Sequence, residues 1–311
     1  MILLTGAAGF IGSNVLEELN NRGITDIICV DDLDDSKKCK NLTGKKFVDY
    51  LDCQELFLQR LPKLDAIIHL GAISNPGATN VREVIDNNFT QTKKLLRLLD
   101  QNSCPFVYAS SASVYGDNAT EFTEDNDCEK PQSPYALSKY MIDQYVRRLG
   151  LPAVGLRYFN VYGPGEAHKG EYASFAHKIF CATFTEKRIP LMQHPIKSIR
   201  RDFVYVKDAV DVTLHFVTNP GQGVYNVGRG VAEGFDDVLR VAALVVGPPI
   251  DVYELTYAAE LPDTFKGRYQ FYTCADTTKL KTVWHKPFVS LEDGMRDYWK
   301  KFRERRAWNV T

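Results

Sequence analysis

Short apolar runs alternate with longer amphipathic stretches along the first half of the chain. The runs are rich in β-branched and aromatic residues, and turn-forming residues separate them, as is typical of β-strands. The longer stretches carry apolar residues at helical spacing. The predicted strands span Ile2–Thr5, Ile27–Val30, Lys45–Val48, Ala66–Leu70, Phe106–Ala109 and Val154–Phe159, and the predicted helices span Ser13–Asn21, Val81–Leu99 and Pro134–Leu149.

This alternation predicts βαβ units, which build a parallel sheet with right-handed crossovers and helices on both faces. We therefore predict an α/β fold, a doubly wound parallel sheet of Rossmann type. Beyond Gly163-Pro164 the alternation weakens to a helix-like segment at Ala173–Phe184 and short runs at Phe203–Val206 and Val224–Val227. We expect residues 1–165 to form a dinucleotide-binding domain, to which a segment near 203–230 returns, and residues 166–311 to form mainly a smaller, mixed substrate-binding lobe.

The composition favours a small-molecule partner. The 311 residues carry 38 Lys and Arg against 39 Asp and Glu, so no overall field attracts nucleic acid or an anionic membrane. Seven scattered cysteines without a C-x-x-C pair argue against disulfides or a zinc site and favour a reducing, cytoplasmic setting. The six histidines lack metal-ligand spacing, so no metal is expected. Because no signal-length apolar run opens the chain, neither export nor membrane spanning is expected.

A glycine-rich turn follows the first predicted strand. Gly6, Gly9 and Gly12 lie between this strand and the first predicted helix with the spacing G-x-x-G-x-x-G. Such glycines permit a tight turn, let a pyrophosphate approach the backbone and pack the helix against the strand, while the helix N-terminus faces the phosphates. Glycines also serve ordinary turns. However, Asp31 and Asp32 end the second predicted strand, where a carboxylate can hold ribose hydroxyls, and this context favours a dinucleotide.

The residues leave open which nicotinamide dinucleotide is bound. Asp31 suits the free 2′-hydroxyl of NAD, whereas Lys37, Lys38 and Lys40 could pair with the 2′-phosphate of NADP. Three lysines in a loop are also common on an ordinary solvated surface. The expected cofactor is therefore NADP or NAD, tightly bound.

A serine cluster and a Tyr-x-x-x-Lys pair supply candidate catalytic groups. Ser111 follows the fifth predicted strand, and Tyr135 and Lys139 share one face of the next predicted helix because they are spaced i and i+4. An ammonium close to a phenol stabilises the phenolate and lowers its pKa from about 10 toward the range of a general base. Surface helices also carry this spacing by chance. The strand-end serine, which can orient the substrate oxygen, makes a catalytic set the better interpretation.

With these motifs the sequence resembles the extended short-chain dehydrogenase/reductase family, the NAD-dependent epimerases and dehydratases that act on nucleotide-activated sugars. The resemblance covers nearly the whole chain. It rests on the glycine turn, the Ser111, Tyr135 and Lys139 set, and the segments His69-Leu70-Gly71-Ala72, Asn87-Asn88, Arg157–Pro164, Arg201–Val206 and Tyr225-Asn226-Val227-Gly228. Family members that dehydrate hexoses usually carry an Asp-Glu pair where this chain has Ala112 and Ser113, so a dehydratase is disfavoured.

Two segments look like those of ADP-glycero-manno-heptose 6-epimerases in particular. They are His168-Lys169-Gly170 and, near the C-terminus, Lys266–Gln270. In those enzymes a lysine of the first segment works opposite the tyrosine, and by position it is Lys169 here. Inversion by oxidation and re-reduction requires hydride to leave one face and return to the other, so a second acid/base group is sensible. A phosphate clamp or a surface charge is an equally good interpretation of Lys169 from the residues alone.

The resemblance also implies binding residues. The implied cofactor contacts are Gly6, Gly9, Phe10, Ile11, Gly12, Asp31, Asp32, Lys38, Leu70, Gly71, Ala72, Ser74, Asn87, Lys139 and Val161. The implied substrate contacts are Ser111, Asn160, Lys169, Glu171, Lys178, Arg201 and Tyr269, of which Arg201 suits a bidentate diphosphate clamp.

Three positions depart from the heptose-epimerase pattern. Cys53 stands where a lysine near the adenosine phosphate is common, which weakens the expectation of NADP and leaves Lys38 to hold it. Glu171 and Lys178 replace a small hydroxyl residue and a histidine. Because a glutamate repels a diphosphate, Glu171 either turns away or bonds hydroxyls of a different sugar.

The leading hypothesis is a redox epimerase that inverts C6 of an ADP-heptose with a held nicotinamide cofactor. The alternative is a 4-epimerase or a 4-keto reductase that acts on another nucleotide-diphospho-sugar. A non-catalytic dinucleotide sensor is disfavoured because Ser111, Tyr135 and Lys139 are intact. The family resemblance implies a homo-oligomer.

Overall fold

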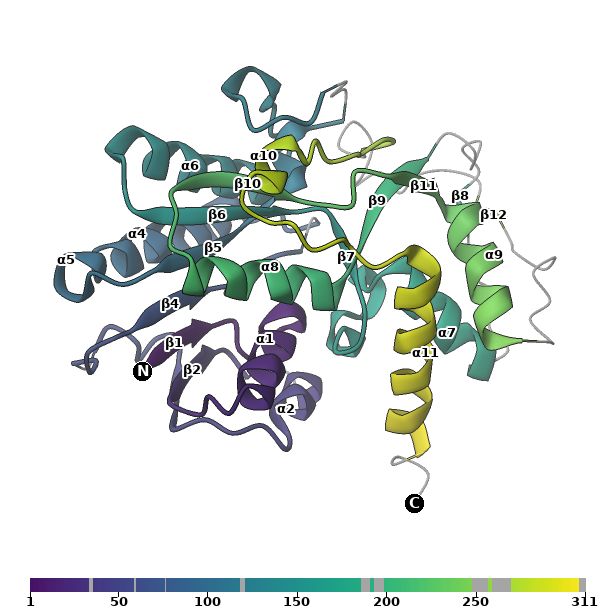
Figure 1. Ribbon diagram of the computed structural model, residues 1–311, viewed down its shortest axis with the longest axis horizontal. Helices are drawn as coiled ribbons and strands as arrows, with labels where there is room; N and C mark the ends of the chain where they lie inside the picture. Colours follow the sequence, from purple (N-terminus) through teal and green to yellow (C-terminus); the bar gives the residue numbers. More distant parts are fainter. Residues whose placement is uncertain are drawn as a thin grey trace.

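A parallel sheet of seven strands forms the centre of the protein (Figure 1). The computed structural model describes residues 1–33, 36–58, 60–75, 77–117, 121–185, 191–192, 199–247, 257–258 and 270–307. The predicted doubly wound α/β fold is confirmed, because every neighbouring pair in this sheet is parallel. The strand order is β10 (Gly223–Val227), β6 (Ala153–Tyr158), β5 (Phe106–Ser111), β4 (Ala66–His69), β1 (Ile2–Thr5), β2 (Ile27–Asp31) and β3 (Asp49–Asp52).

The prediction of a strand at Lys45–Val48 is wrong, and the edge strand β3 begins one residue later, at Asp49. Asn20 accepts a hydrogen bond from the Lys46 amide and donates one to the Lys46 carbonyl, so this segment is tied to the end of the first helix. Val48 is 59% exposed, whereas Leu51 is buried within β3. The apolar pattern therefore misplaced the strand because Phe47 and Val48 belong to the connection.

Helices cover both faces of the sheet. On one face, α1 (Phe10–Asn21) and α8 (Val206–Thr218) pack on Leu4 and Ile68 of the strands, and α2 (Ser36–Leu42) lies beside α1. On the other face, Leu95 of α4 (Gln91–Leu96) and Ile142 of α6 (Pro134–Leu149) pack on the strands. All residues of β1 are buried, as expected for a parallel strand covered on both sides.

The predicted helix Val81–Leu99 is interrupted rather than uniform. It consists of α3 (Val81–Ile85), a π-helical turn η1 (Asp86–Thr90) and α4, and is followed by the short α5 (Leu99–Asn102). Single π-helical turns inside α-helices are frequent at functional sites. This turn contains Asn87, an expected cofactor contact, and the fully buried Asn88.

The later part of the chain forms smaller sheets and a helical cluster. A three-stranded sheet has the order β11 (Ala232–Gly234), β9 (Arg200–Tyr205) and β7 (Asn160–Tyr162), and β12 (Tyr257–Ala258) pairs with β8 (Leu191–Met192). The helices α7 (Phe175–Thr185), α9 (Phe235–Val246) and α11 (Leu291–Ala307) gather beyond β9, on the right of Figure 1. The remaining elements are η2 (Ala112–Tyr115), η3 (Asn126–Cys128), η4 (Ala167–Tyr172) and α10 (Thr278–Lys281). In the part of the chain that the structure describes, no helix has the length and apolar character needed to cross a membrane.

The strand order reverses between β1 and β4, because β2 and β3 lie on one side of this pair and β5, β6 and β10 lie on the other. In open parallel sheets ligands bind at such a switch point, outside the carboxyl ends of the strands. A buried chain of hydrogen bonds fixes the two strand ends here. His69, at the end of β4, contacts Thr5 at the end of β1 through Nδ1 (2.6 Å) and Thr92 of α4 through Nε2 (2.7 Å). Burial lowers the pKa of His69 to about 3, and the charge of Lys139 adds to the effect.

We predict that His69 makes the protein less stable in mild acid. Below pH 6.5 the unfolded chain gains a proton on this imidazole, which the folded protein does not bind until the pH approaches its pKa of about 3. The free energy of unfolding should therefore fall on acidification by up to about 1.4 kcal/mol per pH unit from this group. Urea unfolding of the wild type and of His69→Gln from pH 7 to pH 4 measures the contribution of His69 as the difference between their free energies of unfolding. If this difference does not change with pH, the acid sensitivity does not come from His69.

Candidate active site

The glycine turn between β1 and α1 is built from close backbone contacts. Gly6 has φ +70°, and a Cβ there would lie 2.6 Å from the Gly71 amide nitrogen. A Cβ on Gly12 would lie 1.9 Å from the Gly6 carbonyl oxygen. Gly9 is the N-cap of α1, and within the described residues no side chain caps this helix end. The turn therefore requires glycine for its own geometry, and its uncapped amides fit a pyrophosphate.

Asp31 ends β2 beside this turn, and its carboxylate is buried. Its Oδ2 accepts a hydrogen bond from the Ala8 amide (2.7 Å), and its Oδ1 accepts from Lys38 Nζ (2.6 Å). Lys38 also donates to the Asp32 carbonyl. Lys38, which could pair with the 2′-phosphate of NADP, is thus already paired with Asp31, the carboxylate expected to hold the 2′-hydroxyl of NAD. Asp32, the next residue, is exposed, and so is Cys53, whose amide donates to the Asp31 carbonyl at 3.2 Å.

The chain after β4 forms the opposite wall of the switch point. Leu70 and Gly71 donate backbone hydrogen bonds to the Thr5 carbonyl and to Thr5 Oγ1, which fixes the segment that continues through Ala72 and Ser74. Asn88 of the π-helical turn then accepts from the Ile73 amide and donates to the Ile73 carbonyl. Asn88 Nδ2 also donates to Ser138 Oγ of α6 at 2.9 Å, so this one amide joins the wall to the helix that carries Tyr135 and Lys139.

The structure brings Ser111, Tyr135 and Lys139 together at the carboxyl end of β5. Ser133 caps α6 by accepting from the Ala136 amide, and Pro134 occupies the first turn, so the helix begins just before Tyr135. The Tyr135 phenol is hydrogen-bonded to the Ser111 side chain. Lys139 is 2% exposed, and its Nζ donates to the Ala109 carbonyl at 2.7 Å and lies 5.9 Å from the Tyr135 ring centroid.

Burial dominates the acid–base properties of this set. It raises the pKa of Tyr135, while the hydrogen bond from Ser111 acts in the opposite direction. Burial lowers the pKa of Lys139 to about 8, and the charge of Asp143 opposes that shift. The Tyr–Lys spacing predicted a lowered pKa for the phenol. The structure shows a raised one, because desolvation outweighs the effect of the neighbouring groups.

Lys169 lies on η4, close to the start of α1. Its Nζ is 5.4 Å from the ring centroid of Phe10, the first residue of that helix. The buried Glu166 fixes the start of this segment, because its carboxylate accepts from the Gly163 amide (3.2 Å) and from the Ser174 amide (2.6 Å) and hydroxyl (2.7 Å). Lys169 therefore stands at the glycine turn on a firmly held element.

Glu171 and Lys178 are exposed, and their charges act on each other. Partial burial lowers the pKa of Lys178, and the carboxylates of Glu171 and Glu166 oppose this effect. A lysine beside Glu171 offsets the repulsion that this glutamate exerts on a diphosphate.

The other expected substrate residues lie on the small sheet. Asn160 is exposed at the start of β7, while Arg201 of β9 is 5% exposed and donates to the Arg200 carbonyl. The fully buried Asp202 accepts from the amides of Arg229, Gly230 and Ala275 and so fixes β9. Val161, an expected cofactor contact, is partly buried against the core, and Ile11 is placed similarly in α1. Tyr269 and the segment 266–269 lie outside the described residues.

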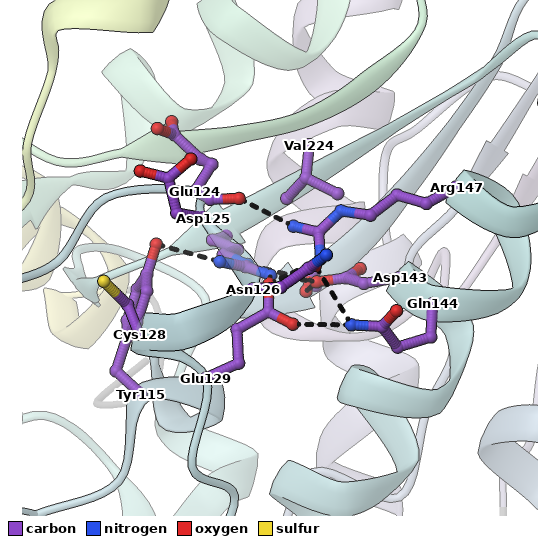
Figure 2. Close-up of polar contacts among 12 residues, drawn as sticks. Tyr115, Glu124, Asp125, Asn126, Cys128, Glu129, Asp143, Gln144, Arg147 and Val224 are labelled. Carbon is purple, nitrogen blue, oxygen red and sulfur yellow. Dashed lines mark hydrogen bonds and ion pairs between the residues drawn. The ribbon is translucent and has the colours of Figure 1, made fainter.

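A buried ion cluster behind α6 was not predicted from the sequence. Arg157 of β6 is fully buried and bonds to Asp143 of α6, Glu129 and the Tyr115 hydroxyl. Figure 2 shows Gln144 and Arg147 turned toward Glu129. Although burial alone would lower the pKa of Arg157, the neighbouring Asp143, Tyr115 and Glu129 raise it. Arg157 and its partners are far apart in the sequence. The Arg157-Tyr158-Phe159-Asn160 motif was therefore the only part of this cluster that the sequence pointed to.

Comparison with known proteins identifies the family. Residues 2–228 match the model of the NAD dependent epimerase/dehydratase family. The chain is similar to ADP-L-glycero-D-manno-heptose-6-epimerase from Helicobacter pylori, with 26% identity, coverage of 97% of this chain and 96% of that one, and a TM-score of 0.84.

Two further solved structures share 26% identity, coverage of 98% of this chain and 99% of the other, and a TM-score of 0.81. They are MoeE5 in complex with UDP-glucose and NAD, and UDP-glucose 4-epimerase from Thermotoga maritima with UDP-glucose. With the matched family model covering most of the chain, and with a parallel sheet and glycine turn of the expected form, the chain belongs to the NAD-dependent epimerase/dehydratase family.

Proposed function

We propose that the protein inverts one carbon of a nucleotide-diphospho-sugar by oxidation and re-reduction with bound NAD. The observation that carries the proposal is the meeting of Ser111, Tyr135 and Lys139 at the carboxyl end of β5, at the same edge of the sheet as the glycine turn. A hydroxyl, a phenol and a buried ammonium gathered at one strand end are the groups that proton removal from a sugar alcohol requires.

The residues at the switch point fit NAD. The amides of Gly9 and the first turn of α1 would face its pyrophosphate, Asp31 its adenosine ribose and Lys139 its nicotinamide ribose. When bound, NAD supplies the hydride acceptor and returns the hydride in the second half of the reaction. The Lys38–Asp31 ion pair favours NAD, because a 2′-phosphate would have to approach the Asp31 carboxylate.

Tyr135 would take the proton of the sugar hydroxyl as the general base. Its raised pKa must fall for this role, and two positive charges favour the phenolate: the ammonium of Lys139 and the oxidised nicotinamide ring. Ser111, already bonded to the phenol, would orient the sugar oxygen. On re-reduction the sugar oxygen takes a proton back, either from the phenol, if one group serves both steps, or from a second acid that faces the turned carbonyl, and in that case the two groups then restore their protons by exchange with solvent.

For the substrate we propose an ADP-heptose that is inverted at C6, with Lys169 as the second acid/base group. The His168-Lys169-Gly170 segment and the likeness to the Helicobacter pylori enzyme support this choice. Lys169 stands at the start of α1, beside Phe10, where an acid/base group or a phosphate clamp would both be in place. The likeness to the Thermotoga maritima enzyme favours a UDP-sugar 4-epimerase as the second candidate.

The substrate is tested directly by NMR. Purified protein incubated with ADP-D-glycero-D-manno-heptose should change the configuration at C6 without net consumption of NADH. Inversion at C4 of UDP-glucose instead would establish the second candidate, and stoichiometric NADH oxidation with a keto sugar would establish a reductase. Loss of all these activities, with NAD bound, would reject epimerisation of either substrate.

We predict that Tyr135→Phe lowers kcat by about 10²- to 10⁴-fold, the usual contribution of a general acid–base group. NAD affinity and the melting temperature should change little, because the ring and its packing remain. Tyr145→Phe is the matched control, since Tyr145 lies on the same helix and packs on Phe89 behind the site. Full activity of Tyr135→Phe would contradict the assigned role.

For Lys169→Met, a fall in kcat indicates an acid/base group, whereas a rise in KM alone indicates a phosphate clamp.

We further predict that cofactor-free protein binds NAD at least about tenfold more tightly than NADP, a difference of about 1.4 kcal/mol. Replacing Asp31 by Ser should narrow or reverse this ratio, because it removes a repelling carboxylate and releases Lys38 for a phosphate. Asp49, exposed at the start of β3 and not among the expected cofactor contacts, is replaced in the same way as the control. Calorimetric titration measures both affinities. An unchanged ratio in Asp31→Ser would show that this carboxylate does not select the cofactor.

A further inference from the structure

We propose that Asp143, held by the buried Arg157, is a positioning residue that keeps Lys139 charged and seated against β5. Asp143 lies one helical turn beyond Lys139 on α6 and is 0% exposed. Its contacts are all with protein groups behind the site, so it acts through Lys139 and not on substrate. The catalytic consequence rests on the proposed function, whereas the effect on Lys139 does not.

Asp143 and Lys139 together hold three consecutive residues of β5. Asp143 Oδ1 accepts from the Tyr108 hydroxyl (3.0 Å), and Oδ2 accepts from Ser110 Oγ (2.8 Å). Between these two residues lies Ala109, whose carbonyl accepts from Lys139 Nζ at 2.7 Å. Since alternate residues of a strand point to one face, Tyr108 and Ser110 both turn toward α6. Asp143 therefore fixes the strand segment on which the ammonium group is seated.

Arg157 fixes Asp143 in turn. Its Nε and Nη2 donate to Asp143 Oδ2 at 3.1 and 3.0 Å, and its guanidinium also bonds to Glu129. Both carboxylates are fully buried, but their other partners differ. Glu129 accepts from Gln144 (2.9 Å) and Arg147 (2.7 Å), further along α6, as Figure 2 shows. Asp143 alone of the two carboxylates also contacts β5.

Among the charges around Lys139, that of Asp143 favours the charged form of the lysine. Burial lowers the pKa of Lys139 to about 8, close to the working pH, and Asp143 opposes the shift. From β4, His69 faces the ammonium but stays neutral, because its own pKa is about 3. From β5 and β6, Tyr108 and Arg157 face Asp143, and burial raises the pKa of Tyr108 so that it stays a neutral donor. Loss of the Asp143 charge should thus lower the pKa of Lys139 further, so that the ammonium loses part of its charge at neutral pH.

The test compares Asp143→Asn with Glu129→Gln, each of which removes one carboxylate partner of Arg157. Both variants should be less stable than the wild type, as a purely structural role predicts for each. The titration of Lys139, followed by the ε-carbon signal in ¹³C-lysine NMR and assigned with Lys139→Met, should separate them. We expect a downward shift of at least about one pH unit in Asp143→Asn, wild-type behaviour in Glu129→Gln, and rescue in Asp143→Glu.

Equal titration of Lys139 in the wild type and Asp143→Asn, or an equal shift in Glu129→Gln, would overturn the proposal. If Asp143→Asn does not fold, the paired replacement of Asp143 by Leu and Arg157 by Met removes both charges of the ion pair, which buried sites often tolerate. The same downward shift is expected there, and its absence counts against the proposal. With substrate, the alkaline fall in kcat should move to lower pH in Asp143→Asn. A shifted lysine in a protein that turns over no sugar nucleotide would reject the proposed function and leave this inference standing.

Discussion

The active-site half of the molecule depends on a single buried guanidinium, that of Arg157. It joins β6 to α6 through Asp143 and to the chain before α6 through Glu129, and it lies 4.9 Å from the ring centroid of Tyr115. A buried charge is tolerated only when it is paired and fully hydrogen-bonded, and removal of one partner of such a pair typically costs about 3–5 kcal/mol. The helix that carries Tyr135 and Lys139 is therefore fixed by electrostatics and not only by its apolar face.

A second constraint acts on the cofactor side, where backbone approaches backbone. Gly6 and Gly71 come from adjacent strands, and Gly12 packs against the Gly6 carbonyl within the turn. Side chains are excluded from these contacts, so the turn itself presents main-chain groups. The side-chain amide of Asn88, which holds the segment after β4 at Ile73, is hydrogen-bonded to Ser138 of α6. Hydrogen bonds therefore link the glycine turn to the helix that carries Tyr135 and Lys139.

Local features of the sequence predicted most of this frame. The helix Pro134–Leu149 was predicted with its observed bounds because its ends are marked locally: Ser133 caps it, Pro134 occupies the first turn, and Gly150 closes it in the left-handed conformation. The Tyr135 and Lys139 pair was found for the same reason, since i and i+4 share a face. The strand misplaced at Lys45–Val48 lies at an edge, where pairing partners and not the apolar pattern decide the bounds.

Long-range charge pairing could not be predicted in the same way. Nothing near Asp143 in the sequence indicates Arg157 as its partner. Lys38 looked like a possible ligand for the 2′-phosphate of NADP, but in the structure it pairs with Asp31. The roles assigned to Ser111, Tyr135, Lys139 and Lys169 stay predictions, although the structure brings the first three together.

Burial of both members of the Tyr–Lys pair has a consequence for catalysis that neither shift shows alone. Desolvation penalises the charged form of each group, so it raises the pKa of the phenol and lowers that of the ammonium to about 8. At neutral pH the phenol is therefore firmly neutral and the ammonium only just charged, so Tyr135 needs a nearby positive charge or a strengthened hydrogen bond before it gives up its proton. Asp143 favours this, because it holds Lys139 on the charged side at neutral pH. If Tyr135 is the base that we propose, it is neutral at rest beside a cation that just keeps its charge, which suits a reaction that must take a proton and give it back within one turnover.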